Sequence, residues 1–220
     1  VDDELSTFKD TSSVTKLRQN KLKIEDAPEM VQEVWRGCLK AKEFTEGAFD
    51  PWKVTGGFDP SGYVKGWAAD NALELLREHG ATSAQVNAAG DISLFGGYPS
   101  NGSISPWRIG IRDPKDPIRI VKVIERESGA IATSGTYEKG AHIRDPKTGM
   151  IAIGALSATV VGPEGGIGMP VRIGGVAILR RHLGGDQWQN LRIVRQRIDR
   201  MNLKLAERRG ERDLLLAADV

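Results

Sequence analysis

The chain has 220 residues, of which 31 are lysine or arginine and 29 are aspartate or glutamate, giving a net charge of +2. This length suits one large domain or two small ones with a buried core, and so small a charge does not indicate a nucleic acid or a membrane surface as partner. The lone cysteine, Cys38, excludes an internal disulfide and a thiolate metal cluster, and no apolar run is long enough to cross a bilayer.

Two amphipathic helices are predicted in the first part of the chain. The first begins after Asp26, which we expect to cap it, with Pro28 in the first turn. The second covers residues 66–79 and stops at Gly80. Cys38 falls on the apolar stripe of the first helix, so a buried and unreactive thiol is predicted.

From residue 84 onward the pattern changes to short β runs that are joined by Gly, Pro, Asn or Ser. Such closely spaced runs favour antiparallel pairs, and the lack of a regular βαβ alternation predicts an α+β fold. The expected strands cover residues 84–88, 91–95, 107–112, 118–127, 130–133 and 156–161.

The C-terminal part of the chain differs in composition. Residues 1–167 contain 12 Lys and 8 Arg, whereas residues 168–220 contain 1 Lys and 10 Arg. We therefore divide the chain into a domain over 1–167 and an atypical Arg-rich tail over 168–220. Apolar residues recur at helical spacing within 186–216, so the tail is predicted to be helical and to dock on a partner. A change of reading frame near residue 168 is a second explanation of the Lys/Arg switch.

The segment 59–70 has features that suit an anion. A helix with a Lys and a Gly in its first turn offers unpaired N–H groups, a positive dipole end and a mobile ammonium, which suit a phosphate or pyrophosphate. Ser61 can cap the helix or bind the ligand, and Asp59 can accept a hydrogen bond from a ribose or a ring N–H. The alternative is an ordinary capped helix with Lys65 in solvent, and the spacing alone favours that alternative.

Two further segments place polar groups at expected turns. Residues 87–92 join two β runs and by themselves indicate a tight hairpin turn. Residues 133–137 carry more hydroxyl groups than turn chemistry alone explains. His142 follows among polar residues, although a lone histidine is more often structural than catalytic. The sequence has no dinucleotide-binding glycine motif, no nucleophile elbow and no zinc-protease motif.

Several of these segments occur in the order in which one known family has them, and this order makes the match specific. With them the chain resembles the FAD:protein FMN transferases, also called the ApbE or thiamine biosynthesis lipoprotein family, in a compact actinobacterial-like variety. The matching segments fall within 1–167 and cover residues 5–12, 45–51, 59–70, 87–92, 107–114, 133–137, 142–149 and 157–163.

This resemblance implies an α+β fold of β-α-β motifs, with mostly antiparallel strands around a flavin-binding cleft. It implies an enzyme that cleaves FAD and attaches the FMN half through a phosphoester to a Thr or Ser hydroxyl of a target protein, with Mg²⁺ as cofactor and release of AMP. The implied partners are FAD and an acceptor protein, either a membrane redox subunit or a flavin-carrying domain. We also expect the full-length protein to be an extracytoplasmic lipoprotein anchored to the membrane.

The resemblance assigns one group of residues to the flavin ring. Phe8, where the family often has Tyr, would lie on the isoalloxazine, with Lys9 and Asp10 beside it. Ala48 would contact the flavin through its backbone.

A second group is assigned to the rest of FAD and to the chemistry. Asp59 would hydrogen-bond FAD, Lys65 would reach its phosphate side, and the Gly62 carbonyl would bind Mg²⁺. His142 becomes the candidate for the base that takes the proton of the attacking hydroxyl. The site around FAD would be completed by Thr133, Ser134, Tyr137 and Ile143.

The chain departs from the family pattern in two places. It lacks the family's N-terminal strand, so we expect it to be truncated there. Beyond residue 163 the family has an Asp and a Thr that bind the metal, whereas the corresponding positions here hold Met169 and Ile173, although Mg²⁺ prefers hard oxygen ligands. The alternative function is a flavin-binding or degenerate homologue without transferase activity. A protein that docks through its basic tail is a third interpretation, which leaves the matching segments unexplained.

Overall fold

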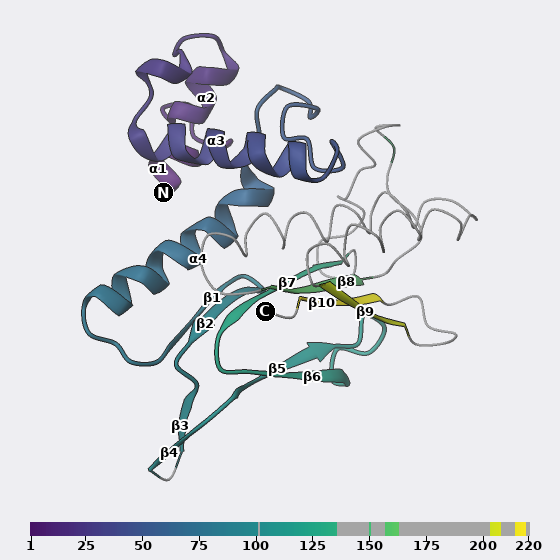
Figure 1. Ribbon diagram of the computed structural model, residues 1–220. Helices are drawn as coiled ribbons and strands as arrows, with labels where there is room; N and C mark the ends of the chain where they lie inside the picture. The colour runs from purple at the N-terminus through teal and green to yellow at the C-terminus, as the bar shows by residue number, and fades with distance from the viewer. Residues whose placement is uncertain (101, 136–149, 151–156, 163–202, 208–213, 219–220) are drawn as a thin grey trace.

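The computed structural model describes residues 1–100, 102–135, 150, 157–162, 203–207 and 214–218. The N-terminal helices stand above helix α4 (Ser61–Glu78), which descends to a six-stranded sheet (Figure 1). This combination of helices with mainly antiparallel strands confirms the predicted α+β class. Among the helices described, none has both the length and the apolar character that a membrane crossing requires.

The N-terminal layer differs from the prediction at the start of its long helix. Asp26 does not cap this helix but ends a short 3-10 helix, and the long helix begins at Glu29 with Pro28 before it. Proline suits this position because its fixed φ fits the helix entry and it has no N–H to leave unpaired. The helices of the layer are α1 (Asp2–Leu5), α2 (Ser13–Arg18), η1 (Ile24–Asp26) and α3 (Glu29–Phe44).

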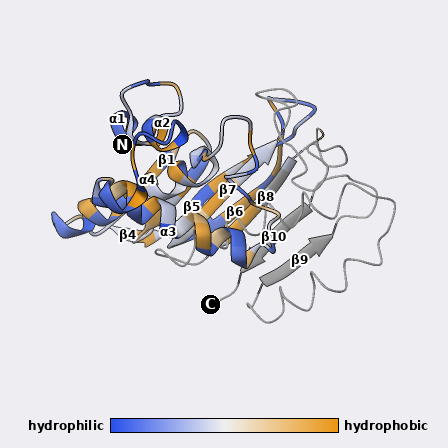
Figure 2. Cartoon of the chain, turned by 90° about the horizontal axis from the view of Figure 1, so that it is seen from above, coloured by the Kyte–Doolittle hydropathy of each residue, from blue (hydrophilic) through white to orange (hydrophobic). Residues whose placement is uncertain are grey.

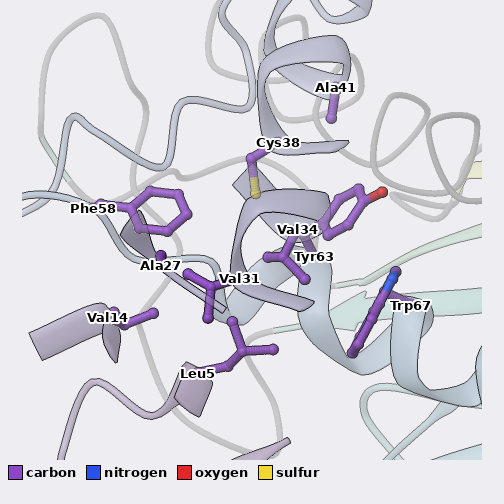
Figure 3. Close-up of a cluster of buried hydrophobic side chains, with 10 residues drawn as sticks. All are labelled: Leu5, Val14, Ala27, Val31, Val34, Cys38, Ala41, Phe58, Tyr63 and Trp67. Carbon is purple, nitrogen blue, oxygen red and sulfur yellow. The ribbon is translucent and has the colours of Figure 1, made fainter. Parts of the chain in front are cut away.

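The core of this layer lies around α3 and the first half of α4 (Figure 3). Cys38 lies inside it, which confirms the predicted buried thiol. Burial raises the pKa of the Cys38 thiol, and the nearby carboxylate of Asp59 raises it further. The buried residues are Leu5, Val14, Ala27, Val31, Val34, Cys38, Ala41, Phe58, Tyr63 and Trp67.

Helix α4 begins earlier than predicted. It starts at Ser61 rather than at residue 66, because Asp59 Oδ1 accepts a 2.9 Å hydrogen bond from the Ser61 N–H and so satisfies a donor of the first turn. Its predicted stop is confirmed, since Gly80 follows the helix with φ of +88°.

The main sheet has six strands in the order β1-β2-β7-β8-β10-β9. Neighbouring strands are antiparallel except for β8 and β10, which are parallel. The strands predicted at 84–88 and 91–95 are confirmed, and those predicted at 130–133 and 156–161 differ from the observed ones only at their ends. The strands are β1 (Ala84–Ala88), β2 (Asp91–Phe95), β7 (Gly129–Gly135), β8 (Ser157–Gly162), β9 (Leu203–Glu207) and β10 (Leu214–Ala218).

The helix predicted over 186–216 is wrong where β9 and β10 lie. Strand β10 pairs with β8, with Leu214 opposite Ala158, and also pairs with β9. Its sequence is an uninterrupted apolar run, which is typical of strands that are covered on both faces of a sheet. These two tail strands therefore belong to the same sheet as the strands of 1–167, and residues 168–202 lie outside the described part.

Two hairpins complete the described fold. Ile109 and Ile111 of the larger hairpin pack against Ile92 and Leu94 of β2, on the sheet face opposite to Ser93, which contacts α4. Viewed from above, hydrophobic residues lie on the middle strands around β7 and β8 (Figure 2). The hairpins are β3 (Tyr98–Ser100) with β4 (Ser103–Ser105), and β5 (Trp107–Arg112) with β6 (Ile120–Arg126).

Candidate functional site

The first turns of α4 meet the β1–β2 turn through an ion pair. Lys65 Nζ lies 3.7 Å from Asp91 Oδ2, and the Asp91 side chain is only 16% exposed. Lys65 therefore contacts the sheet while its side chain remains 42% exposed, so the structure differs from the ordinary capped-helix alternative only in this contact.

The turn that carries Asp91 is held in one conformation by its own residues. Ala89 and Gly90 both have positive φ, at +52° and +95°. The side-chain oxygen of Asn87 accepts a 2.9 Å hydrogen bond from the Gly90 N–H. This geometry confirms the tight hairpin turn predicted for residues 87–92.

The loop before α4 lies against the first turn of that helix. A Cβ atom on Gly62 would lie 3.2 Å from the Phe49 ring, so the ring can pack this closely because glycine has no side chain. The neighbouring Ala48 is buried, and its N–H donates a 3.0 Å hydrogen bond to the Thr45 carbonyl. The predicted flavin contact Ala48 and the predicted metal ligand Gly62 therefore lie in the same region as Asp59, whose carboxylate accepts the hydrogen bond from the first N–H of the helix.

Thr133 and Ser134 lie near the C-terminal end of β7. Thr133 Oγ1 is 2.9 Å from Thr159 Oγ1 of β8, so these hydroxyls bond to each other across the sheet. Ser134 is the next residue and pairs with Ala158 in the same ladder. Their contact with FAD stays a prediction.

The three residues predicted beside the flavin ring lie in the N-terminal layer. Phe8 is 93% exposed, and Asp10 is exposed as well. Lys9 Nζ forms ion pairs with Asp2 and Asp3 at 2.6 Å each, and hydrogen bonds to these carboxylates raise the pKa of its ammonium. The ion-pair partners of Lys9 are thus in the N-terminal helix α1, whereas Lys65 pairs with Asp91 of β2.

Sequence reasoning missed a buried carboxylate in the loop between α3 and α4. Lys42 Nζ pairs with Asp50 Oδ2 at 2.9 Å, and the Asp50 side chain is only 2% exposed. The same ammonium lies 5.4 Å from the ring centroid of Trp52, which packs with Trp35 and Phe58 in an aromatic cluster. Asp50 could have been found from the sequence because it lies within the family-like segment 45–51. Its partner Lys42 could not, because nothing in the sequence connects the two residues.

Several predicted site residues lie outside the described residues. These are Tyr137, His142 and Ile143, whose roles stay predictions. Met169 and Ile173, which occupy the family's metal-ligand positions, also lie outside the described residues. In the part of the chain that is described, no group of three or more Asp, Glu, His or Cys side chains is arranged to hold a metal ion.

The fold defines the class of protein to which the chain belongs. The solved ApbE protein of Thermotoga maritima matches it with a TM-score of 0.71 over 88% of this chain and 79% of that one, at 24% identity, which shows a shared fold. A model of the ApbE family matches residues 52–168, which include α4, the Lys65–Asp91 pair and β7. The chain therefore belongs to the ApbE family, and the resemblance stated from its sequence is confirmed.

Two relatives with the name FAD:protein FMN transferase support this assignment. The one from Rhodobacter capsulatus is 33% identical over 117 residues, covering 50% of this chain and 22% of the relative. The one from Treponema pallidum is 34% identical over 111 residues, covering 43% of this chain and 30% of the relative. Each match thus spans less than a third of the relative's own length.

Proposed function

We propose that this protein is an enzyme that transfers the FMN half of FAD to a Thr or Ser hydroxyl of a target protein, with release of AMP. The observation that supports this most is the position of Asp59, Lys65 and Asp91 around one end of α4, inside the segment that matches the ApbE family. The name of this activity is carried by two relatives of the same family.

In the proposed reaction the acceptor oxygen attacks the phosphorus of the FMN half. A new phosphorus–oxygen bond forms, the pyrophosphate bond breaks, and AMP leaves with the bridging oxygen. The hydroxyl proton passes to a base, for which we propose His142. Because negative charge shifts within the pyrophosphate as the bond breaks, a positive group held beside it stabilises the transition state. Lys65 is the cation that we assign to this position.

The remaining predicted residues are assigned to binding. Phe8 is exposed enough for its ring to lie on an isoalloxazine without first leaving a core. Asp59 keeps a second carboxylate oxygen beyond the one that caps α4, and this oxygen is assigned to a hydrogen bond with FAD. The other proposed FAD contacts are Lys9, Asp10, Ala48, Thr133, Ser134, Tyr137 and Ile143.

Mg²⁺ is part of the proposal because the resemblance implies it. The described residues do not fit that ion on their own, because Gly62 offers one backbone carbonyl within α4 and they contain no acidic cluster. Met169 and Ile173 have no side-chain oxygen, whereas Mg²⁺ prefers oxygen ligands. No step above is therefore assigned to the metal.

One observation favours a second function, the binding of flavin without transfer. The family match ends at residue 168, directly before the positions that hold Met169 and Ile173. A chain that has lost two metal ligands would keep FAD and leave its pyrophosphate intact.

The decisive experiment incubates the protein with FAD and a Thr-containing acceptor domain, in Mg²⁺ and in EDTA. Transferase activity predicts AMP in the chromatogram and a fluorescent flavin that stays on the acceptor after denaturation. An acceptor with the Thr replaced by Val is the control, because it has no hydroxyl to attack. FAD binding without AMP would favour the second function, and no FAD binding would contradict both.

We also propose the cellular setting and the domain organisation. The acceptor is assigned as a membrane redox subunit or flavin-carrying domain, and the full-length protein as an extracytoplasmic, membrane-anchored lipoprotein. The transferase-like domain is kept at 1–167, with β9 and β10 of the 168–220 tail joined to its sheet. Cell fractionation with an antibody to this chain tests the location, and recovery in the cytosol would contradict it.

A further inference from the structure

Helix α4 is fixed over β2 by two polar bridges on the same sheet face. Lys65 Nζ lies 3.7 Å from Asp91 Oδ2. About a turn and a half further along the helix, Asp70 Oδ1 accepts a 2.5 Å hydrogen bond from Ser93 Oγ. Asp91 and Ser93 are two residues apart on β2, so both side chains point to α4, and the two bridges set how the helix lies along the strand.

The second bridge makes the first one rigid. Ser93 is only 1% exposed and its hydrogen bond to Asp70 is partly buried, so this contact resists sliding of the helix. At the other end, the positive φ angles of Ala89 and Gly90 hold the turn that presents Asp91. The carboxylate of Asp91 is thus placed by the backbone of β2.

The distance within the Lys65–Asp91 pair has a chemical consequence. At 3.7 Å the two atoms attract each other, but they are too far apart for a hydrogen bond. The ammonium is therefore oriented by the carboxylate while its three N–H donors are not used by that oxygen. A free lysine side chain has many rotamers, and restricting them before binding lowers the entropy cost of contacting a ligand.

We propose that Asp91 is a positioning residue, which holds the Lys65 ammonium ready for the pyrophosphate of FAD. This inference rests on the proposed function and adds to it the residue that orients the phosphate-binding lysine. The selectivity that it produces is for the phosphate part of the ligand, because the flavin ring has no charge for Lys65 to contact.

Riboflavin is the comparison ligand, since it has the same ring as FAD and no phosphate. The ratio of the riboflavin and FAD dissociation constants, measured by fluorescence titration, reports how much the pyrophosphate and the adenosine of FAD together contribute to binding, and of these two parts only the pyrophosphate carries negative charge for Lys65 to contact. The variants are D91N, which keeps the shape of the side chain, K65M, and the double variant. The control is E125Q, which removes the same charge from the exposed Arg108–Glu125 pair on the β5–β6 hairpin.

We expect D91N to lower this ratio by about tenfold, a coupling of the size seen between contacting charged residues. K65M should lower it at least as much, and adding D91N to K65M should change it by less than about twofold, because Asp91 acts through Lys65. Riboflavin binding and the E125Q ratio should stay at the wild-type value. Turnover with the acceptor should show the same pattern in kcat/KM.

Three results would overturn the role of Asp91. D91N could leave the ratio unchanged, it could tighten FAD binding because the carboxylate competes with phosphate for Lys65, or its effect could add fully to that of K65M. A purely structural role is one form of the first result: D91N would lower thermal stability and weaken FAD and riboflavin equally, which leaves the ratio unchanged. If Asp91 positions Lys65, D91E, which retains the charge, should keep the ratio closer to the wild-type value than D91N does. Failure of the wild type to bind FAD would instead overturn the proposed function.

Discussion

Trp67 of α4 donates a 2.8 Å hydrogen bond from its indole Nε1 to Oε1 of Glu33 on α3. The Trp67 side chain is 6% exposed and lies in the core of the N-terminal layer, whereas Glu33 is exposed, so this partly buried bond joins the two long helices at the edge of that core. The orientation of α4, which carries Asp59 and Lys65, therefore depends on its contact with α3 as well as on the sheet.

We expect W67F to lower the free energy of unfolding by about 1–2 kcal/mol, because the hydrogen bond is lost together with part of the buried indole. Urea unfolding followed by circular dichroism measures the change. E33Q keeps an acceptor oxygen and should cost less than about 0.5 kcal/mol. Equal losses in W67F and E33Q would mean that the charge of Glu33, and not the bond, matters.

Gly37 marks a close approach between the same two helices. A Cβ atom there would lie 2.0 Å from the Tyr63 hydroxyl oxygen and 2.3 Å from its ring carbon Cζ. Alanine normally stabilises a helix relative to glycine, but here we expect G37A to destabilise the protein by roughly 1–3 kcal/mol through overpacking. Thermal unfolding tests this, with G110A as control, since its Cβ would meet only the flexible end of Ile120 at 3.1 Å. A stabilised G37A would contradict the observed packing.

The buried Cys38 thiol predicts a loss of stability in alkaline solution. Burial raises its pKa in the folded state above the ordinary value of 9.0, so the folded protein holds this proton more tightly than the unfolded chain does. The contribution is complete below about pH 9 and decreases as the pH rises above that value. Unfolding free energies measured from pH 7 to 10.5 should fall more steeply for the wild type than for C38A, and parallel curves would contradict the shift.

A substitution of Phe8 can test ligand binding apart from stability, because its side chain is 93% exposed and packs in no core. We expect F8A to leave the melting temperature unchanged and to weaken both FAD and riboflavin by about three- to tenfold, as the loss of an aromatic stacking partner would. The equal effect on both ligands distinguishes Phe8 from Lys65, which should affect only FAD. An F8A variant with wild-type affinity for both would remove Phe8 from the site.

The sequence allowed local features of the fold to be predicted where neighbouring residues decide the structure. The β1–β2 hairpin is one example, because Asn87, Gly90 and Asp91 specify a tight turn by themselves. The start of α4 was missed because Ser61 and Gly62 are weak helix formers, and the hydrogen bond that Asp59 accepts from the Ser61 N–H could not be read from their propensities. The family-like segments are also short runs of neighbouring residues, and for that reason the sequence alone indicated where the candidate site lies.

Features that depend on packing between distant segments could not be predicted. Lys65 and Asp91 lie in different elements, and nothing in the pattern of either one specifies the other. In the tail, the spacing of apolar residues over 186–216 predicted a helix that includes part of β10. A short apolar run such as that of β10 fits a buried strand as well as a helix, so the sequence alone does not decide between them. The pairing with β8 decided between them.

The parallel pairing of β8 with β10 also affects how the protein is made. During synthesis β8 emerges long before its partner, since Leu214 pairs with Ala158 across more than fifty residues of chain. Until β10 has left the ribosome, one edge of the nascent sheet exposes unpaired backbone groups that can join strands of other molecules. The helices of the N-terminal layer can pack at once, whereas completion of the sheet waits for this late, non-local contact. Newly made chains are therefore most exposed to aggregation in that interval, and they are the form on which a chaperone would act.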